Sequence, residues 1–199
     1  MKTGFLTQWQ TSYSIKEGYK WLQGESRNVP WSKWVWNRYN IPKHSVIAWM
    51  ATLGKLITKA HLFGIGVVTE KMCLMCGLQE ESIEHCFFQR KYSLQCYVKI
   101  CRRLKLSATP MDHINSSWKK WSRKYACKRK KSTCLVVLAA LVYQIWCARN
   151  CAYWEKRIPR PEVLVDNVMH SVCNRVRQLI NSKWSQGEKD WLEELARIQ

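Results

Sequence analysis

The stretch CLMCGLQEESIEHCFFQR constrains the fold most, because it begins like a zinc knuckle. Cys73 and Cys76 are separated by two residues, so one tight turn can present both sulfurs to a single ion. Gly77 follows them and permits the positive φ that such turns often need. His85 comes after a further spacer, and Arg90 stands where a fourth ligand is expected. The stretch therefore predicts three zinc ligands and a departure at the fourth position.

The residues around His85 leave the fourth zinc ligand open. Cys86 is adjacent to the histidine, but neighbouring residues on a helix point about 100° apart, so chelation by both would require distortion. Cys96 lies one helix further along and reaches the ion only if the backbone bends toward it. Three protein ligands plus water is the coordination of catalytic zinc, yet no nearby motif indicates a reaction. Zinc with Cys86, Cys96 or water as fourth ligand, and a helical fold without metal, are all consistent with the sequence.

The ten cysteines are expected to be reduced. The N-terminal sequence MKTGFLTQWQ lacks the apolar core of a signal peptide, and the cysteines lie in helical patterns rather than in loop-rich sequence. We therefore expect an intracellular protein in which some cysteines bind metal.

The longest apolar run extends from Cys134 to Ala148 and is shorter than the ~18 residues expected of a membrane span. A buried core helix is the preferred interpretation, and no membrane partner is expected. The basic residues Lys128 to Lys131 just before the run keep a membrane anchor as the weakest alternative.

The formal net charge of +19 makes a polyanion the first partner to expect. Between Arg90 and Lys131 there are 14 lysines and arginines and one acidic residue. Trp118, Trp121 and Tyr125 alternate with these cations, as base stacking beside phosphate contacts would require. This region predicts sequence-tolerant binding of RNA or DNA. The candidate nucleic-acid-binding residues are Arg102, Arg103, Lys119, Lys120, Arg123, Lys124, Lys128, Arg129, Lys130 and Lys131. The KRKK run is interpreted as a nuclear localisation signal or phosphate-binding patch, or else as a solvated loop between helices.

Nearly all local signals are helical, and we predict a mainly α fold: a small helical domain with a zinc-knuckle-like loop, followed by a C-terminal helical region. Ser14 and Glu17 form a capping box, Pro42 suits the first turn of a helix, and Thr58 can cap a short helix that the glycines at 64 and 66 would end. Further helices are expected in SLQCYVKICRRLKL, HINSSWKKWSRKY, the apolar run and the tail GEKDWLEELARIQ. A last amphipathic helix has apolar residues at Val165, Val168, Met169, Val172, Val176, Leu179 and Ile180.

Several ordered motifs together resemble a known family. They are YSIKEGYKWL, the tryptophan-rich WSKWVW, PKHSVIAW, LITKAHL and CLMCGLQEESIEHCFF, with VYQIWCARN further downstream. Their order and spacing resemble the reverse-transcriptase zinc-binding domain of plant non-LTR (LINE-type) retrotransposon polyproteins, with its C-x2-C-G…E-x-x-x-H-x-F-F-x-C knuckle and a later IW-x-x-R-N element. The resemblance covers residues 10–98 well and 140–180 loosely.

The resemblance implies zinc as the cofactor, with Cys73, Cys76 and His85 as ligands, but the final cysteine of the family pattern is Arg90 here. We predict a zinc-binding-like domain over residues 10–98, a basic linker or helical region over 99–131 and a C-terminal helical region over 132–199. A plant origin and a nuclear location are also expected.

Catalysis is not expected. Polymerase and nuclease chemistry needs clustered carboxylates that hold two metal ions, and neither such a cluster nor a glycine-rich phosphate loop occurs. No small-molecule substrate is predicted. The sequence favours a non-catalytic nucleic-acid-binding module derived from a retrotransposon polyprotein, with a partly degenerate knuckle. The alternative is a helical protein-interaction module or retroelement remnant that does not bind nucleic acid.

Overall fold

A computed structural model describes residues 29–109 and 113–197, and the described residues from Trp31 onward belong to one compact unit. The described residues are mostly helical and contain no strand, which confirms the predicted mainly α class. The elements are α2 (Ser32–Val35), α3 (Pro42–Thr52), α4 (Lys59–Gly64), the π-helix η1 (His85–Gln89), α5 (Lys91–Arg103), α6 (Ile114–Lys124), α7 (Lys128–Trp154), α8 (Pro161–Arg177) and α9 (Gln186–Ala196). The predicted capping box at Ser14 and Glu17 lies outside the described residues.

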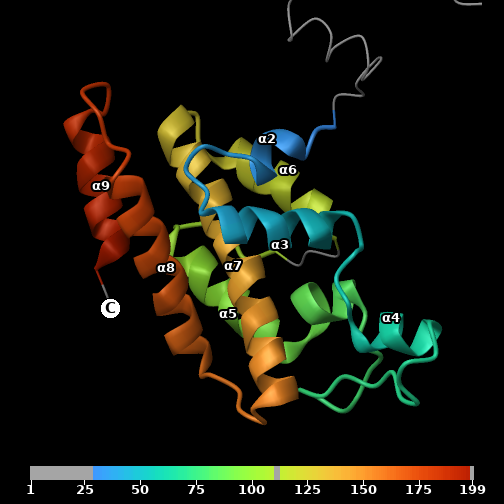
Figure 1. Cartoon of the computed structure of the whole chain (residues 1–199). Coiled ribbons are helices and arrows are strands. Elements are labelled where there is room, and N and C mark those ends of the chain that lie inside the picture. Colours follow the sequence, from blue (N-terminus) through green and yellow to red (C-terminus); the bar gives the residue numbers. More distant parts are fainter. Residues whose placement is uncertain (1–28, 110–112, 198–199) are drawn as a thin grey trace, which may run out of the picture. The chain divides into compact units, whose positions relative to one another are not determined.

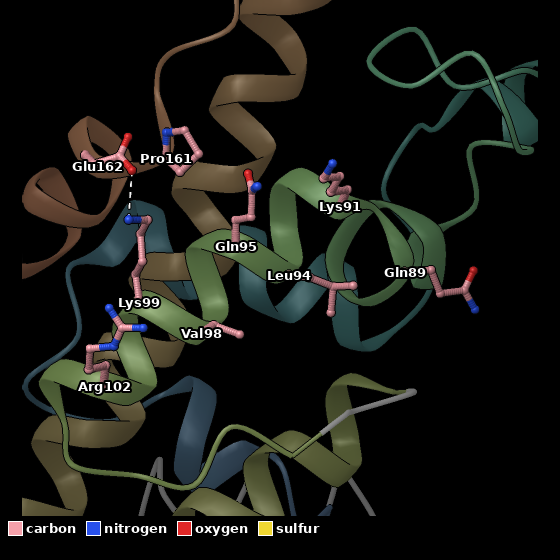
Figure 2. Close-up of a pocket in the computed structure, with 9 residues that line it drawn as sticks. All are labelled: Gln89, Lys91, Leu94, Gln95, Val98, Lys99, Arg102, Pro161 and Glu162. Carbon is pink, nitrogen blue, oxygen red and sulfur yellow. Dashed lines mark ion pairs between the residues drawn. The ribbon is translucent and has the colours of Figure 1, made fainter.

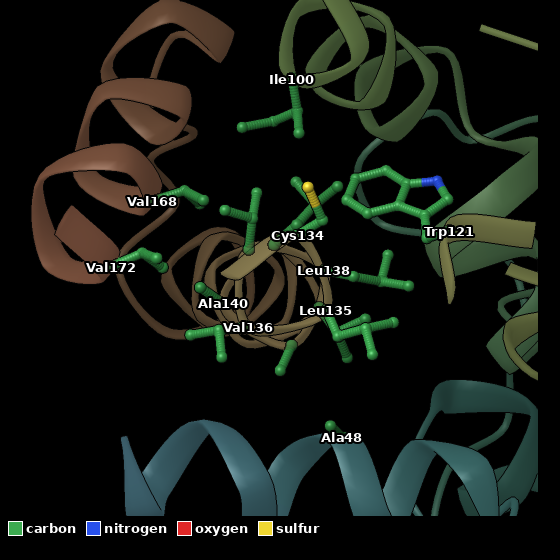
Figure 3. Packing of buried hydrophobic residues seen from close by; sticks show 14 of the residues in the cluster. Ala48, Ile100, Trp121, Cys134, Leu135, Val136, Leu138, Ala140, Val168 and Val172 are labelled. Carbon is green, nitrogen blue, oxygen red and sulfur yellow. The ribbon is translucent and has the colours of Figure 1, made fainter. Parts of the chain in front are cut away.

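Helix α7 is the centre of the fold, with α3, α6 and α8 packed around it (Figure 1). Its residues from Thr133 to Val142 are all buried. Figure 3 shows Ala48 of α3, Trp121 of α6 and Val168 of α8 reaching this helix from different directions. Neighbouring helices cover this part of α7 on its different sides, which explains why its sequence is apolar on every face.

Helix α7 is longer than its apolar run, because the basic residues before the run and polar residues after it continue the same helix. Within the described residues it is the one helix long and apolar enough to cross a membrane, by length and composition alone. Of its most apolar 18-residue window, 72% is buried inside the protein. Burial by neighbouring helices accounts for this apolarity without a membrane.

Helix α3 has Pro42 in its first turn, as predicted. The face that this helix buries is not its most apolar face. The buried residues are His44, Ser45, Ala48 and Ala51. Because these side chains are mostly small, α3 can lie close against α7. The larger apolar residues Val46 and Trp49 are exposed instead, as is Leu53 directly after the helix.

Helix α8 buries the predicted stripe, from Val165 to Val176, against α7 and α5. The helix ends at Arg177, so Leu179 lies after it. Helices α5 and α8 are also joined by ion pairs, between Lys99 and Glu162 at 2.8 Å and between Arg103 and Asp166. The second ion pair lies four residues after the first on both helices, so the two helices run in the same direction.

The predicted domain boundaries fall inside helices. The boundary at 98/99 lies within α5 and the boundary at 131/132 within α7. The KRKK run forms the first turn of α7 rather than a loop between helices.

Candidate metal centre and basic surface

The knuckle is a loop closed by backbone hydrogen bonds. Its two ends are joined where the N–H of Glu81 donates to the carbonyl of Lys71 at 2.9 Å and that of Cys73 donates to the carbonyl of Gln79 at 2.8 Å. At the tip, the N–H of Gly77 donates to the carbonyl of Cys73 at 2.8 Å. Gly77 has a φ of +65°, as the turn was expected to require. This backbone brings the two cysteines of the turn to one side of the loop.

The loop and η1 bring three metal-ligating side chains together. The Sγ atoms of Cys73 and Cys76 and a ring nitrogen of His85 lie within 4.8 Å of one another. His85 Nε2 is 3.3 Å from Cys76 Sγ, and its Nδ1 is 2.9 Å from Gln79 Oε1. An amide oxygen accepts only, so Nδ1 carries the proton and Nε2 presents its lone pair to Cys76 Sγ. The donor set and its orientation fit zinc.

A π-helix places the histidine. The N–H of His85 donates to Ser82 Oγ at 3.0 Å, and the N–H of Arg90 donates to the carbonyl of His85 at 2.9 Å. The second bond spans five residues, which defines the wide π turn, a form frequent at functional sites. Position 90 is consequently fixed directly beside His85, a candidate metal ligand.

The environment changes the proton affinities of the three donors. Burial raises the pKa of Cys73, although Arg90 opposes this change. Burial also raises the pKa of Cys76, but the N–H of Leu78 and other donors outweigh it, and the net pKa is lowered. Burial, followed by Arg90, lowers the pKa of His85. A more acidic thiol and a neutral imidazole are the forms that bind zinc.

Arg90 is buried, with 1% of its surface exposed, and its guanidinium reaches back into the knuckle. Nη1 donates to Met75 Sδ at 2.7 Å, and Nη2 donates to Cys86 Sγ at 3.2 Å. Nη2 also lies 3.6 Å from Glu81 Oε2. Arg90 thus cannot contact phosphates, which corrects the prediction that the basic region begins at this residue.

Glu81 joins the knuckle to the helical body. Its carboxylate is fully buried, and Oε1 accepts from Nε and Nη2 of Arg149 at 3.0 and 2.7 Å and from the N–H of Lys59 at 3.0 Å. Arg149 belongs to α7. The sequence did contain a signal for this contact, because Glu81 and Arg149 are the acidic and basic residues of two motifs that resemble the family.

Cys86 and Cys96 lie outside the metal-ligating cluster. The Cys86 thiol accepts a hydrogen bond from the guanidinium of Arg90, and burial raises the pKa of this thiol to about 12. Cys96 is on α5, fully buried, and burial raises its pKa to about 12 as well. Both thiols are therefore protonated at neutral pH and poorly suited to bind metal without rearrangement.

Most of the predicted nucleic-acid-binding cations form a surface on α6 and the start of α7, which we call the basic surface. Among the residues that the structure describes, the following basic-surface cations have no ion pair: Lys119, Lys120, Arg123, Lys124, Lys128, Lys130 and Lys131. Arg129 lies among them but pairs with Glu188 at 2.9 Å.

The aromatic residues between these cations face inward. Trp118 and Trp121 are 0% and 2% exposed, and Trp118 packs on Trp34 with ring centroids 6.3 Å apart. The half-buried Tyr125 donates its hydroxyl to the carbonyl of Leu104 at 2.6 Å. The expectation that these rings stack on bases is therefore wrong for the two tryptophans, because their spacing serves packing of α6 on the core.

A groove of about 600 Å³ lies along α5, next to the start of α8 (Figure 2). Leu94 and Val98 form its apolar part, and Lys91, Lys99 and Arg102 supply cations. Lys99 is already neutralised by Glu162, as Figure 2 shows, and the nearby predicted residue Arg103 is paired with Asp166. Arg102 and Arg103 were both predicted to bind nucleic acid. Among the described residues, only Arg102 of these two is exposed and without an ion pair.

Residues 13–97 match the protein family described as zinc-binding in reverse transcriptase. No curated protein and no solved structure matches the chain. The family match confirms the resemblance to a reverse-transcriptase zinc-binding domain and includes Cys73, Cys76, His85 and Arg90, whereas α6 to α9 lie beyond it. The matched family is a zinc-binding domain and not the catalytic domain of reverse transcriptase.

Proposed function

We propose that this chain, which contains a reverse-transcriptase zinc-binding domain over residues 13–97, is a non-catalytic module that binds RNA or DNA without sequence preference. The basic surface supplies the contacts to phosphates, and the knuckle binds zinc through Cys73, Cys76 and His85. Zinc, when bound, cross-links the knuckle and supplies no reaction step. The KRKK turn at the start of α7 also supports a nuclear location.

The unpaired cations of the basic surface are the observation that supports nucleic-acid binding best. Elsewhere on the described surface several cations are neutralised by ion pairs, such as Lys99 and Lys105, whereas the run from Lys119 to Lys131 has a single pair. An array of uncompensated charges repels itself, and a polyanion relieves that repulsion. Since the tryptophans beneath are buried, the contacts are to the backbone of the nucleic acid, which agrees with weak sequence preference.

Salt-dependent binding tests this proposal. Retardation of a single-stranded RNA and a DNA duplex should be visible at ~50 mM salt and weaken steeply as salt rises, because bound phosphates release counterions. The triple variant K120Q/R123Q/K124Q should lower the slope of log K against log salt by about 2 for single strands, about 0.7 for each lost contact.

The matched control is K156Q/R157Q/R160Q, which removes three exposed cations from the segment between α7 and α8. This control should bind with an unchanged slope. Absence of binding by the wild-type chain at ~50 mM salt, or equal losses in both triple variants, would remove the basic surface from the proposal.

Metal content tests the zinc part separately. The purified full chain should carry about one zinc ion, and Cys73→Ser should lose it, because it removes a donor of the cluster. Cys96→Ser should retain the ion, since Cys96 lies on α5 outside the cluster. Zinc that is retained in Cys73→Ser and lost in Cys96→Ser would contradict this assignment.

Binding of another protein is the second candidate function, and an exposed apolar stripe on α3 favours it. Val46, Trp49 and Leu53 are each about 40% exposed, and Trp36 lies beside Trp49 with ring centroids 6.0 Å apart. Exposed apolar patches mark interaction sites more often than chance surface. A chain that fails to bind nucleic acid but whose oligomeric state changes in Trp49→Ser would support this candidate over the first.

A further inference from the structure

The metal centre has three protein donors where a structural zinc site has four. Within the described part of the chain, the cluster consists of Cys73, Cys76 and His85, and no further Cys, His, Asp or Glu joins it. The thiol of Cys86, the residue next to His85, accepts a hydrogen bond from Arg90 instead. Zinc that binds to three protein donors completes its coordination with an external ligand.

Arg90 performs the mechanical task of a fourth ligand. A ligand at position 90 would tie the start of α5 to the turn that carries the two cysteines. The guanidinium makes the same connection without metal, because it donates to Met75 Sδ inside that turn and is held by the buried Glu81. The backbone of Arg90 is in addition fixed to His85. The three donors are therefore assembled without a fourth protein ligand.

The buried charges around the site favour an anion. Two thiolates neutralise Zn²⁺, so the loaded cluster itself has no net charge. Glu81 compensates only one of the two buried guanidinium groups, those of Arg90 and Arg149. One positive charge therefore remains uncompensated in this buried environment, and an anionic ligand on the metal would balance it.

The site is open to solvent on one side. Cys73 is 1% exposed and faces the interior, whereas Cys76 is partly exposed. Leu78 and Gln79, which follow in the loop, are both exposed. A small ligand can approach the cluster from this side without opening the helical body.

We propose that the centre is a three-ligand zinc site whose fourth position takes an exchangeable small anion, attracted by the buried Arg90. This inference rests on the zinc binding proposed above. It assigns Arg90 a positioning role, because the guanidinium acts on the bound anion through charge and does not coordinate the metal.

The test uses the full chain loaded with Co²⁺ in place of zinc, because the d–d absorption of cobalt reports its ligands. Sodium azide is the anion, and perchlorate of equal ionic strength is the non-coordinating control. Azide should change the wild-type spectrum saturably. Arg90→Cys should bind cobalt with an additional sulfur charge-transfer band and should not respond to azide, since a fourth protein ligand fills the site. Arg90→Gln should respond with an affinity about tenfold lower, because the attracting charge is gone.

The outcomes separate this inference from the proposal it rests on. A chain that takes up no Co²⁺ or Zn²⁺ would overturn both. Metal uptake with a spectrum that azide leaves unchanged would overturn the open position alone, and so would an equal azide response in Arg90→Cys. An azide affinity that is the same in wild type and in Arg90→Gln would remove the role of the guanidinium. Arg90→Gln also keeps the inference testable if Arg90→Cys does not fold.

Discussion

The helical body and the knuckle are each stabilised by a different kind of contact. Around α7, large apolar side chains are buried and charges lie outside, as for Trp118 and the exposed Lys119. In the knuckle, Leu78 is 81% exposed while Arg90 and Glu81 are buried. A loop of this length cannot enclose an apolar core of its own, so oriented polar contacts determine its conformation.

The difference concerns specificity as well as stability. Apolar packing tolerates changes of side chain that keep the volume, whereas a buried ion pair contributes little net stability but penalises the loss of either partner. We therefore expect the helical body to be destabilised mainly by substitutions that remove buried side-chain volume. The knuckle should be destabilised mainly by substitutions that remove one partner of a buried polar contact. Substitutions in the two regions can separate these two modes.

The largest effect is expected in the body. Trp118→Ala removes a fully buried ring and should lower the free energy of unfolding by about 4 kcal/mol, because a cavity remains between α6 and α2. Denaturant unfolding at fixed metal concentration measures the change. Trp154→Ala, at a site 76% exposed, is the control and should change it by less than about 0.5 kcal/mol. Similar unfolding of the two variants would show that the body does not depend on this packing.

The next effect is expected at the junction of the two regions. Arg149→Met should cost about 3 kcal/mol, because the buried Glu81 carboxylate loses both hydrogen bonds from Arg149 and keeps only the more distant Arg90, at 3.6 Å. The double variant Glu81→Met with Arg149→Met should recover part of the loss, since the buried carboxylate is removed together with Arg149, while Arg90 stays buried without a carboxylate. A double-mutant cycle from denaturant unfolding gives the coupling. Additive losses would mean that the two residues are not an ion pair in solution.

A pH-dependent effect follows from His44 in the body. Burial, followed by the charge of Lys43, lowers the pKa of His44 to about 4. Between pH 6.5 and 4 the unfolded chain takes up a proton that the folded chain does not, so stability falls as pH falls and is unaffected above 6.5. The loss should approach about 3 kcal/mol, because a pKa difference of one unit corresponds to about 1.4 kcal/mol.

His44→Leu should remove this part of the pH dependence in thermal unfolding, whereas His61→Gln, at an exposed site, should keep it. The knuckle histidine His85 also has a lowered pKa and contributes equally to both variants. Parallel pH profiles for the two variants would contradict the assignment to His44.

The smallest effects are expected at helix caps on the two sides. Ser185 caps α9 of the body in a reciprocal box with Glu188, and Thr58 caps α4 beside the knuckle by accepting from the N–H of His61 at 3.3 Å. Ser185→Ala and Thr58→Ala should each cost about 1 kcal/mol, and Thr58→Ser should cost less because it keeps the acceptor. Thermal unfolding measures all three, and a Thr58→Ser loss equal to that of Thr58→Ala would exclude the cap as the cause.

The sequence predicted the helices better than the surfaces they bury. Periodicity located α8, and capping chemistry located the starts of α3 and α4, because both signals are local. The buried face of α3 could not be predicted, because the choice of Ala48 over Val46 depends on how closely α7 approaches. Similarly, the spacing of Trp118 and Trp121 agrees equally with stacking on bases and packing on a core.

In the metal centre, the sequence identified all three donors that the structure brings together, since their spacing is set by one loop. It did not identify Gln79 as the residue that orients His85, because an amide in a loop carries no motif. The ion pair between Glu81 and Arg149 spans 68 positions of the chain and depends on the packing of α7 beneath the knuckle. Both residues belong to motifs that resemble the family, but only the tertiary structure shows that they contact each other.

Helix α7 also sets the distance between the basic surface and the knuckle. It carries Arg129 of the basic surface at one end and Arg149, which contacts the knuckle, toward the other. Twenty residues at about 1.5 Å each set these points about 30 Å apart. Because one unbroken helix joins them, the basic surface and the knuckle cannot change their separation unless α7 bends or breaks.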